Sequence, residues 1–207
     1  LSEKINCLGI MPCDVSDTSS LESVRDGING NIDFFVHAVA YSDKNELSGK
    51  YLNTSKENFL KTLHISAYSL TEMIRLFSPK MNDGASIMAL TYYGSTRYMQ
   101  SYNVMGVAKA ALETSIRYLS VDMGDRGIRV NAISAGPMRT LAGAVINKSR
   151  KIYNYTIENS PIKKPLSLED IGKSSVYLMS DLSKGVTGEI LYVDHGYNNV
   201  GMSIQDL

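Results

Sequence analysis

The chain has 207 residues, 43% apolar and 20% charged, which suits one α/β domain with a sizeable core and excludes wholesale disorder. Its 21 basic side chains balance 21 acidic ones, so a general electrostatic attraction to nucleic acid or to an anionic membrane is not indicated. No apolar run approaches the roughly 18 residues that span a bilayer, and the first residues show no signal peptide. We therefore expect a cytoplasmic protein that binds neither nucleic acid nor membrane.

Cysteine and histidine are too few and too scattered to indicate a metal site. Cys7 and Cys13 lie on one segment without the spacing of a CxxC pair, and His37, His64 and His195 show no metal-ligand spacing. We predict no metal, and two cysteines that stay reduced.

Strand and helix patterns alternate from the start of the chain. Residues 8–15 are expected to form a short strand. A helix is then expected to begin at Ser19, because Ser19 and Glu22 match a capping box, and to stop near Gly27. The near-continuous apolar run over residues 32–39 is typical of a parallel strand that is covered on both faces.

A polar stretch over residues 42–53 is long enough to be a working loop. Thr54 and Glu57 match a second capping box, and the apolar stripe that follows predicts an amphipathic helix that ends before Pro79. The remaining predicted elements alternate between strand and helix, over residues 85–91, 103–123, 128–134, 169–179 and 189–194.

Strands that alternate with helices predict a single α/β domain with a doubly wound, Rossmann-type parallel sheet and right-handed crossovers. In such a sheet the ligand lies beyond the carboxyl ends of the strands. The residues that follow Val15, Val39, Thr91 and Ser134 are therefore the first candidates for a site.

A tyrosine and a lysine stand out on the helix predicted over residues 103–123. Tyr102 and Lys109 are seven positions apart. At roughly 100° per residue, seven steps return to within roughly 20° of the starting direction, so both side chains would project from one face. The ammonium would favour the phenolate and make the phenol a better proton donor to a developing oxyanion. Tyr92 follows a strand at the same end of the sheet and could act as a second donor.

These residues resemble the short-chain dehydrogenase/reductase superfamily, and specifically its enoyl-acyl-carrier-protein reductase branch. Most of the superfamily places the lysine four residues after the tyrosine, with a serine upstream, but position 106 here is Gly. The branch instead uses Tyr-x6-Lys with another tyrosine ten residues earlier, as at Tyr92, Tyr102 and Lys109. The segments YNVMGVAKAALE and RVNAISAGPMRTLA are equally typical of the branch, and the resemblance covers essentially all of residues 1–207 as one NAD-binding domain.

The resemblance implies an NADH site. Asp14 and Val15 would contact the adenine end, the backbone of Val39 would lie beside the adenosine ribose, and Lys109 would hold the nicotinamide ribose hydroxyls. The other implied cofactor contacts, along the nicotinamide and the pyrophosphate, are Gly136, Pro137, Met138, Arg139, Thr140, Leu141 and Ala142.

The implied reaction is the reduction by NADH of the trans-2 double bond of an enoyl-acyl-carrier-protein in fatty acid biosynthesis. Tyr102 would donate to the thioester carbonyl oxygen, with Tyr92 as a second or alternative donor. Ser42 would also contact the substrate, and residues 141–150 would form a segment that closes over the acyl chain. The implied partners are acyl carrier protein and further copies of the chain in a homotetramer.

The sequence departs from the branch in what precedes the CDV segment. Nothing there supplies the first βα unit with its Gly-rich turn, so we expect several tens of residues upstream and no NADH binding by these 207 residues alone. Ala38 and Ala40 also stand where the branch often has Ser and Gly.

Two other functions remain possible at this point. A 3-oxoacyl-carrier-protein reductase would need an upstream serine and Tyr-x3-Lys, against which Gly106 speaks. A non-catalytic Rossmann-type relic or binding module would not need the two tyrosines and the lysine together.

Overall fold

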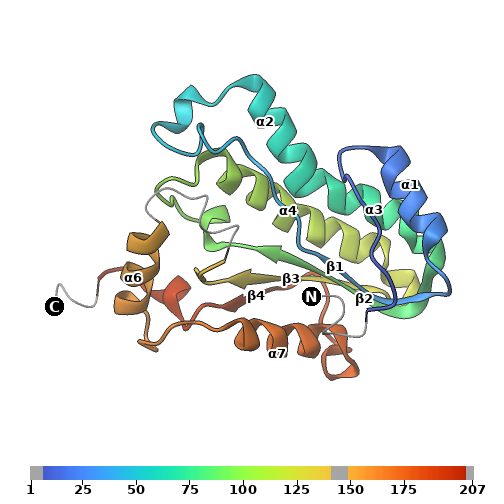
Figure 1. Cartoon of the computed structure of the whole chain (residues 1–207). Helices are drawn as coiled ribbons and strands as arrows, with labels where there is room; N and C mark the ends of the chain where they lie inside the picture. Colours follow the sequence, from blue (N-terminus) through green and yellow to red (C-terminus); the bar gives the residue numbers. More distant parts are fainter. Residues whose placement is uncertain (1–6, 141–148, 204–207) are drawn as a thin grey trace.

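The computed structural model describes residues 7–140 and 149–203, which form a parallel sheet with helices on both faces (Figure 1). The strands are β1 (Ile32–His37), β2 (Met81–Thr91), β3 (Arg129–Ala135) and β4 (Ile190–Val193). They lie in the order β1-β2-β3-β4, and every neighbouring pair is parallel. The predicted doubly wound parallel sheet is therefore confirmed, and the described part of the chain has no strand before β1.

The helices are α1 (Thr18–Gly27), α2 (Lys56–Leu63), α3 (Ser69–Phe77), α4 (Asn103–Asp122), α6 (Ser149–Asn159) and α7 (Leu168–Met179). A π-helical turn, η3 (His64–Tyr68), joins α2 to α3. In Figure 1 helices α1 to α4 lie above the sheet and α7 lies below it. None of the helices within the described ranges has the length and apolarity to cross a membrane.

Two apolar clusters, one on each face of the sheet, form most of the core. Ile87 and Ala89 of β2 belong to the cluster that includes Leu70 of α3 and Ile116 of α4, whereas Met88 packs in the cluster of α7. Alternate residues of one strand thus point to opposite helical layers, as the strand period of two requires. The continuous apolar runs in the sequence reflect this two-sided burial.

Residues 8–15 do not form the predicted strand. The segment is irregular, and Leu8 and Ile10 are exposed. No described strand pairs with it, and a strand needs a neighbour to satisfy its backbone N–H and C=O groups. The expectation that both faces of β1 are covered is also wrong for the described residues, since Phe34 is 57% exposed and Val36 is exposed as well.

The two predicted capping boxes are each displaced from the residues that cap the helices. Asp17, not Ser19, caps α1 by accepting from the Ser19 backbone N–H, and Ser55, not Thr54, caps α2. Neighbouring Asp, Ser and Thr residues are all good caps, so the sequence pattern does not distinguish among them.

Helix α6 was not predicted, because it buries too little to produce an apolar stripe. Only Thr156 and Asn159 are buried along its length. Arg150, which the predicted closing segment included, lies in α6, while residues 141–148 of that segment are outside the described ranges.

Candidate active site

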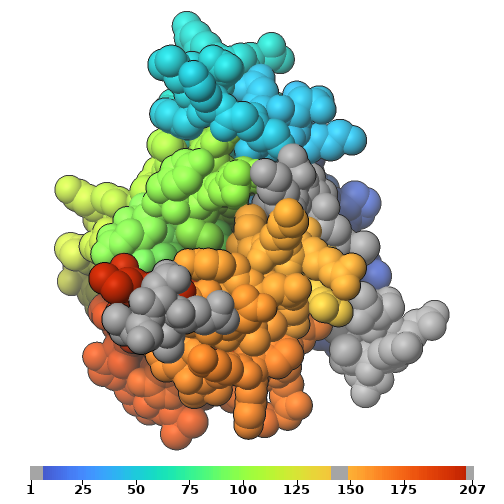
Figure 2. Space-filling model, turned by 90° about the vertical axis from the view of Figure 1, so that its left-hand side faces the viewer, coloured from blue at the N-terminus to red at the C-terminus, as the bar shows by residue number. Residues whose placement is uncertain are grey.

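A cavity of about 260 Å³ lies where β1, β2 and β3 end. Its walls come from the residues that follow these strands, from α4 and from α6. Figure 2 looks onto this side of the molecule, where the orange α6 lies below the green connection between β2 and α4. The predicted site residues that line the cavity are Val39, Tyr92, Tyr102, Lys109, Gly136, Pro137, Met138 and Thr140.

Two tyrosines stand together in the cavity wall. The rings of Tyr92 and Tyr102 meet edge to face, with their centroids 5.0 Å apart. Tyr102 is buried together with Leu47 and Met105, and Tyr92 packs against this small cluster. Aromatic pairs at this distance and angle are mutually stabilising, so each ring helps to fix the other.

Tyr102 is held at the start of α4 by an unusual backbone. It is the N-cap residue of the helix, and Ser101 and Asn103 on either side have φ angles of 61° and 37°. Positive φ is uncommon for residues other than glycine and carries local strain, which is characteristic of functional sites. The Asn103 side-chain amide donates to the Glu46 carbonyl at 2.9 Å, which fixes this turn against the loop that precedes α2.

Two glycines allow the turn after β2 to approach α4 very closely. A Cβ atom on Gly106 would lie 2.7 Å from the Gly94 carbonyl oxygen, and a Cβ on Gly94 would lie 2.5 Å from Cδ1 of Tyr102. Neither contact is sterically permitted, so position 106 has no room for the lysine of a Tyr-x3-Lys arrangement. The lysine of this chain lies farther along α4.

Lys109 lies almost fully buried behind the tyrosines. Its side chain is 6% exposed, and its ammonium donates to the Leu90 carbonyl of β2 at 2.8 Å. The next residue of the strand, Thr91, donates its hydroxyl to the buried Glu113 carboxylate at 2.7 Å. Two consecutive residues at the end of β2 are thus bonded to α4.

Burial controls the protonation of the cavity groups. Loss of solvation raises the pKa of Tyr102, and the neighbouring Tyr92 and Glu113 raise it further; desolvation raises the pKa of Tyr92 as well. Both phenols are therefore neutral hydrogen-bond donors, and the expected shift of Tyr102 toward the phenolate is wrong. Desolvation lowers the pKa of Lys109 to about 8, while the charge of Glu113 opposes this change.

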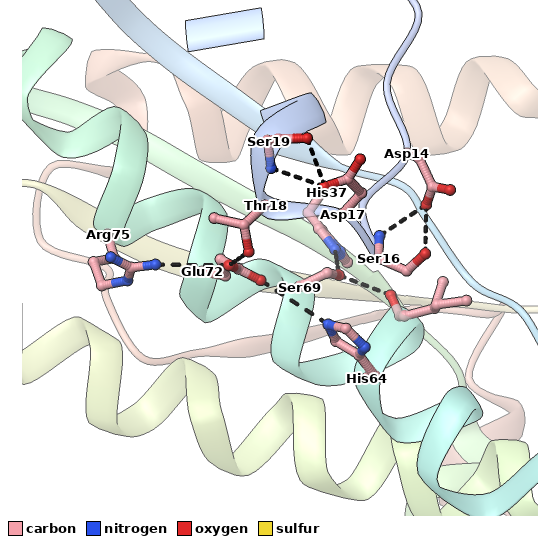
Figure 3. Close-up of polar contacts among 11 residues, drawn as sticks. Asp14, Ser16, Asp17, Thr18, Ser19, His37, His64, Ser69, Glu72 and Arg75 are labelled. Carbon is pink, nitrogen blue, oxygen red and sulfur yellow. Dashed lines mark hydrogen bonds and ion pairs between the residues drawn. The ribbon is translucent and has the colours of Figure 1, made fainter. Parts of the chain in front are cut away.

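His37 is buried at the end of β1, directly before the cavity residues Ala38 and Val39. Figure 3 shows its imidazole beside Ser69. Its Nε2 lies 2.8 Å from Oγ of Ser69, whose hydroxyl donates to the Ile65 carbonyl in η3. Because that hydroxyl proton is committed to Ile65, Nε2 of His37 carries the ring proton. Desolvation, and then the charge of Lys109, lower the pKa of His37 to about 4, so the imidazole is neutral near pH 7.

Asp14 and Val15, expected at the adenine end of the cofactor, do not line the cavity. Figure 3 shows the Asp14 carboxylate turned to Ser16, from whose N–H and hydroxyl it accepts at 2.9 and 2.6 Å. These hydrogen bonds lower the pKa of Asp14. Val15 is buried in the core, and Thr18 donates to the buried Glu72 of α3 at 2.6 Å. The turn before α1 is therefore fixed in place against α3.

Ser42, expected to contact the substrate, takes part in a polar network with α2. Its hydroxyl accepts from the Thr62 hydroxyl at 3.0 Å and lies 3.3 Å from Oδ1 of Asn58, both on α2. The network anchors the start of the long loop and does not reach the cavity wall.

The segment after β3 divides between the cavity and the surface. Pro137, Met138 and Thr140 line the cavity, whereas Arg139 is exposed and stacks over the Tyr153 ring at 4.8 Å. Leu141 and Ala142 lie outside the described residues. Sequence reasoning missed Tyr153, Ile152, Met99 and Gln100 as cavity residues. Two of these belong to the unpredicted helix α6, and no motif marks the other two.

No group of three or more His, Cys, Asp or Glu side chains that could hold a metal ion occurs in the part of the chain that the structure describes. The titratable groups of the cavity are instead phenols and one ammonium, which can donate hydrogen bonds to an oxygen that gains negative charge.

Comparisons with known proteins agree with this geometry. The family described as "Enoyl-(Acyl carrier protein) reductase" matches residues 1–198. The chain is 52% identical to "Enoyl-[acyl-carrier-protein] reductase [NADH] 2" of Rhizobium meliloti, over 98% of this chain and 76% of that protein. It is 49% identical to "Enoyl-[acyl-carrier-protein] reductase [NADH] FabI" of Rickettsia typhi, over 98% of this chain and 79% of that protein.

Solved structures give the same result. The crystal structure of the enoyl-(acyl-carrier-protein) reductase of Anaplasma phagocytophilum in complex with NAD superposes with a TM-score of 0.93 at 46% identity, covering 99% of this chain and 77% of that one. The NADH enzyme of Aquifex aeolicus gives 0.94 at 38% identity, over 97% and 80% of the two chains. With its parallel sheet and its paired tyrosines beside a buried lysine, this chain belongs to the enoyl-(acyl carrier protein) reductase family.

Proposed function

We propose that the cavity at the ends of β1, β2 and β3 is the active site of this protein, which is an NADH-dependent enoyl-acyl-carrier-protein reductase of fatty acid biosynthesis. The observation that supports this assignment is the meeting of Tyr92, Tyr102 and Lys109 in the wall of one cavity. The enoyl chain is a thioester on acyl carrier protein, which is therefore the protein partner.

The residues present fit the reacting end of a nicotinamide cofactor. A volume of about 260 Å³ is below the ~300–1,000 Å³ of typical ligand pockets, so the described walls would enclose one end of a dinucleotide together with the reacting atoms of the substrate. NADH supplies, when bound, the hydride that reduces the double bond. Lys109 would hold the ribose hydroxyls, with Val39, Pro137, Met138 and Thr140 along the cofactor.

Tyr102 would stabilise the negative charge that develops on the thioester carbonyl oxygen. Its raised pKa keeps the hydroxyl protonated and able to donate a hydrogen bond. Donors of this kind in a dry site contribute about 100- to 1,000-fold in rate. Tyr92, whose ring packs on Tyr102, would support the orientation of that ring or supply the alternative donor.

Asp14, Val15, Arg139 and Ser42 would act outside the described cavity. The first two would meet the adenine end of NADH from the turn before α1, where hydrogen bonds already order the backbone. Arg139 is exposed beside Tyr153 at the rim. Ser42 would contact substrate from the long loop.

We further propose that residues 1–207 belong to a single NAD-binding domain and that the enzyme is a cytoplasmic homotetramer. Large apolar side chains are exposed along α4, among them Val107, Tyr118 and Val121, and such surfaces are typical of contacts between subunits. Sedimentation velocity checks the assembly, and a monomer at micromolar concentration would exclude it.

The test of the activity is the loss of NADH absorbance with a trans-2-enoyl thioester, measured on protein from the complete reading frame. Tyr102→Phe should lower kcat by about 100-fold or more. Tyr177→Phe is the matched control, because this tyrosine of α7 is exposed and does not line the cavity, and it should leave kcat unchanged.

Equal rates for wild type and Tyr102→Phe would contradict the role given to Tyr102. No turnover of enoyl thioesters, together with turnover of a 3-oxoacyl thioester by NADPH, would instead assign the protein to ketone reduction.

A further inference from the structure

One buried carboxylate adjoins the active site without forming part of its wall. Glu113 is 3% exposed and lies one helical turn after Lys109 on α4, yet it does not line the cavity. Buried carboxylates are rare unless a positive charge or hydrogen bonds compensate for the lost solvation. The reason for placing one here therefore has to be found among its neighbours.

The neighbours of Glu113 belong to the catalytic end of β2. Thr91 donates its hydroxyl to Oε1 of Glu113 at 2.7 Å, while Lys109 donates to the carbonyl of the preceding residue, Leu90, at 2.8 Å. The next residue along the strand is Tyr92. The end of β2 is thus held by two groups of α4 just before the chain enters the cavity.

Glu113 and Lys109 form no ion pair within contact distance among the described residues, so the carboxylate acts on the ammonium through the intervening low-dielectric space. Among the described residues, Glu113 of α4 acts on Lys109 by its charge, and Lys109 in turn acts on His37 of β1. The phenols of Tyr92 and Tyr102 share the cavity wall with Lys109. The phenols and the imidazole are neutral near pH 7, which leaves Glu113 as the charge that favours the protonated lysine.

We propose that Glu113 is the positioning residue for Lys109: through Thr91 it fixes the end of β2 to which Lys109 is bonded, and its negative charge holds the buried side chain as an ammonium. This inference rests on the proposed function for its catalytic consequence only. Without the carboxylate, the buried lysine would lose its proton at a lower pH, and the end of β2 would lose one of its two attachments to α4, leaving only the bond from Lys109 to the Leu90 carbonyl.

Two substitutions separate the charge from the hydrogen bond. Glu113→Gln removes the charge but keeps an oxygen that accepts from Thr91. Thr91→Val removes the hydroxyl but keeps the charge, and Thr91→Ser restores a hydroxyl. Asp122 is an exposed carboxylate at the other end of α4, so Asp122→Asn is the control for loss of a negative charge.

The direct readout is the titration of Lys109 by NMR. Lysine carrying carbon-13 at Cε is incorporated, and the Lys109 resonance is identified by its disappearance in Lys109→Met. The resonance should titrate near pH 8 in wild type and in Asp122→Asn. In Glu113→Gln its midpoint should be lower by about one to two pH units, and in Thr91→Val it should stay close to wild type.

The kinetic readout is the pH profile of kcat with the enoyl thioester. In Glu113→Gln the fall of activity at alkaline pH should begin at a correspondingly lower pH, and activity should recover toward wild type on acidification. Thr91→Val should lower kcat about 10-fold without changing the pH profile, and Thr91→Ser should restore it.

An unchanged Lys109 midpoint in Glu113→Gln would overturn the inference, even if the protein reduces enoyl thioesters normally. If the Lys109 midpoint is lower in Glu113→Gln but the wild-type protein does not reduce enoyl thioesters, the result would support the inference and reject the proposed function. Should Glu113→Gln not fold, Thr91→Val decides the positioning role, since an unchanged kcat there would overturn it.

Discussion

The burial of His37 predicts a specific loss of stability in acid. The perturbation is His37→Gln, in which the side-chain amide can still donate to Ser69 from about the position of Nε2. The folded protein holds the pKa of His37 at about 4, whereas the ordinary value is 6.5. The unfolded chain therefore binds a proton more readily, and the free energy of unfolding must fall as pH falls from 6.5 toward 4.

The magnitude follows from the two pKa values. At 1.36 kcal/mol for each pKa unit, the complete difference corresponds to about 3 kcal/mol, of which about 2.5 kcal/mol is lost between pH 7 and pH 4.5. This is a large part of the 5–15 kcal/mol that typically stabilises a domain. Glutamine does not titrate, so the variant should lack this component.

The assay is urea unfolding of wild type and His37→Gln at about pH 7 and pH 4.5. Wild type should lose about 2.5 kcal/mol more than the variant on acidification, with similar m-values. His195→Gln is the control, because the Nδ1 atom of His195 contacts the backbone carbonyl of Lys164 at the protein surface, and this variant should keep the wild-type difference. Equal acid losses in wild type and His37→Gln would refute the view that His37 is buried as a neutral imidazole.

Three further predictions concern packing and helix ends. Gly106→Ala should lower the free energy of unfolding in urea by about 1–3 kcal/mol and lower kcat, because the added Cβ would lie 2.7 Å from the Gly94 carbonyl oxygen. An unaltered unfolding midpoint and an unaltered rate would disprove the close contact. Arg129→Met should lower the free energy of unfolding by about 3 kcal/mol or more in the same measurement, since the buried guanidinium donates to carbonyl groups at the end of α7. A decrease below about 1 kcal/mol would show that those carbonyl groups find other partners. Ser167→Ala should lower the free energy of unfolding by about 1 kcal/mol in thermal unfolding, because it removes half of the capping box with Asp170. No change would mean that the first turn of α7 is frayed.

The sheet was predictable because each central strand is apolar on both sides. Residues 85–91 and 128–134 were placed close to the observed β2 and β3, since burial between two helical layers leaves a continuous apolar run. The failure over residues 8–15 has the opposite cause. The apolar residues there match the pattern of a strand. A strand forms only when it pairs with another strand, and this pairing depends on residues far away in the sequence.

The candidate site was predictable in part. The spacing of Tyr102 and Lys109 led to the cavity because helix geometry is local. The protonation state of Tyr102 could not be predicted in this way, since it depends on how completely the neighbouring elements remove water from the phenol. Glu113 gave no signal either, because nothing in the sequence shows that Thr91 will face it across two elements.

The contact between Gly94 and Gly106 also limits how one reductase could evolve into another. A lysine introduced at position 106 would meet the backbone of the turn after β2, which cannot move aside as a flexible side chain can. The turn would have to be rebuilt in the same step, and moving it would disturb Tyr102, whose ring lies against Gly94. A change from one lysine spacing to the other therefore requires several coordinated substitutions in α4 and in the turn after β2, and a single substitution cannot achieve it.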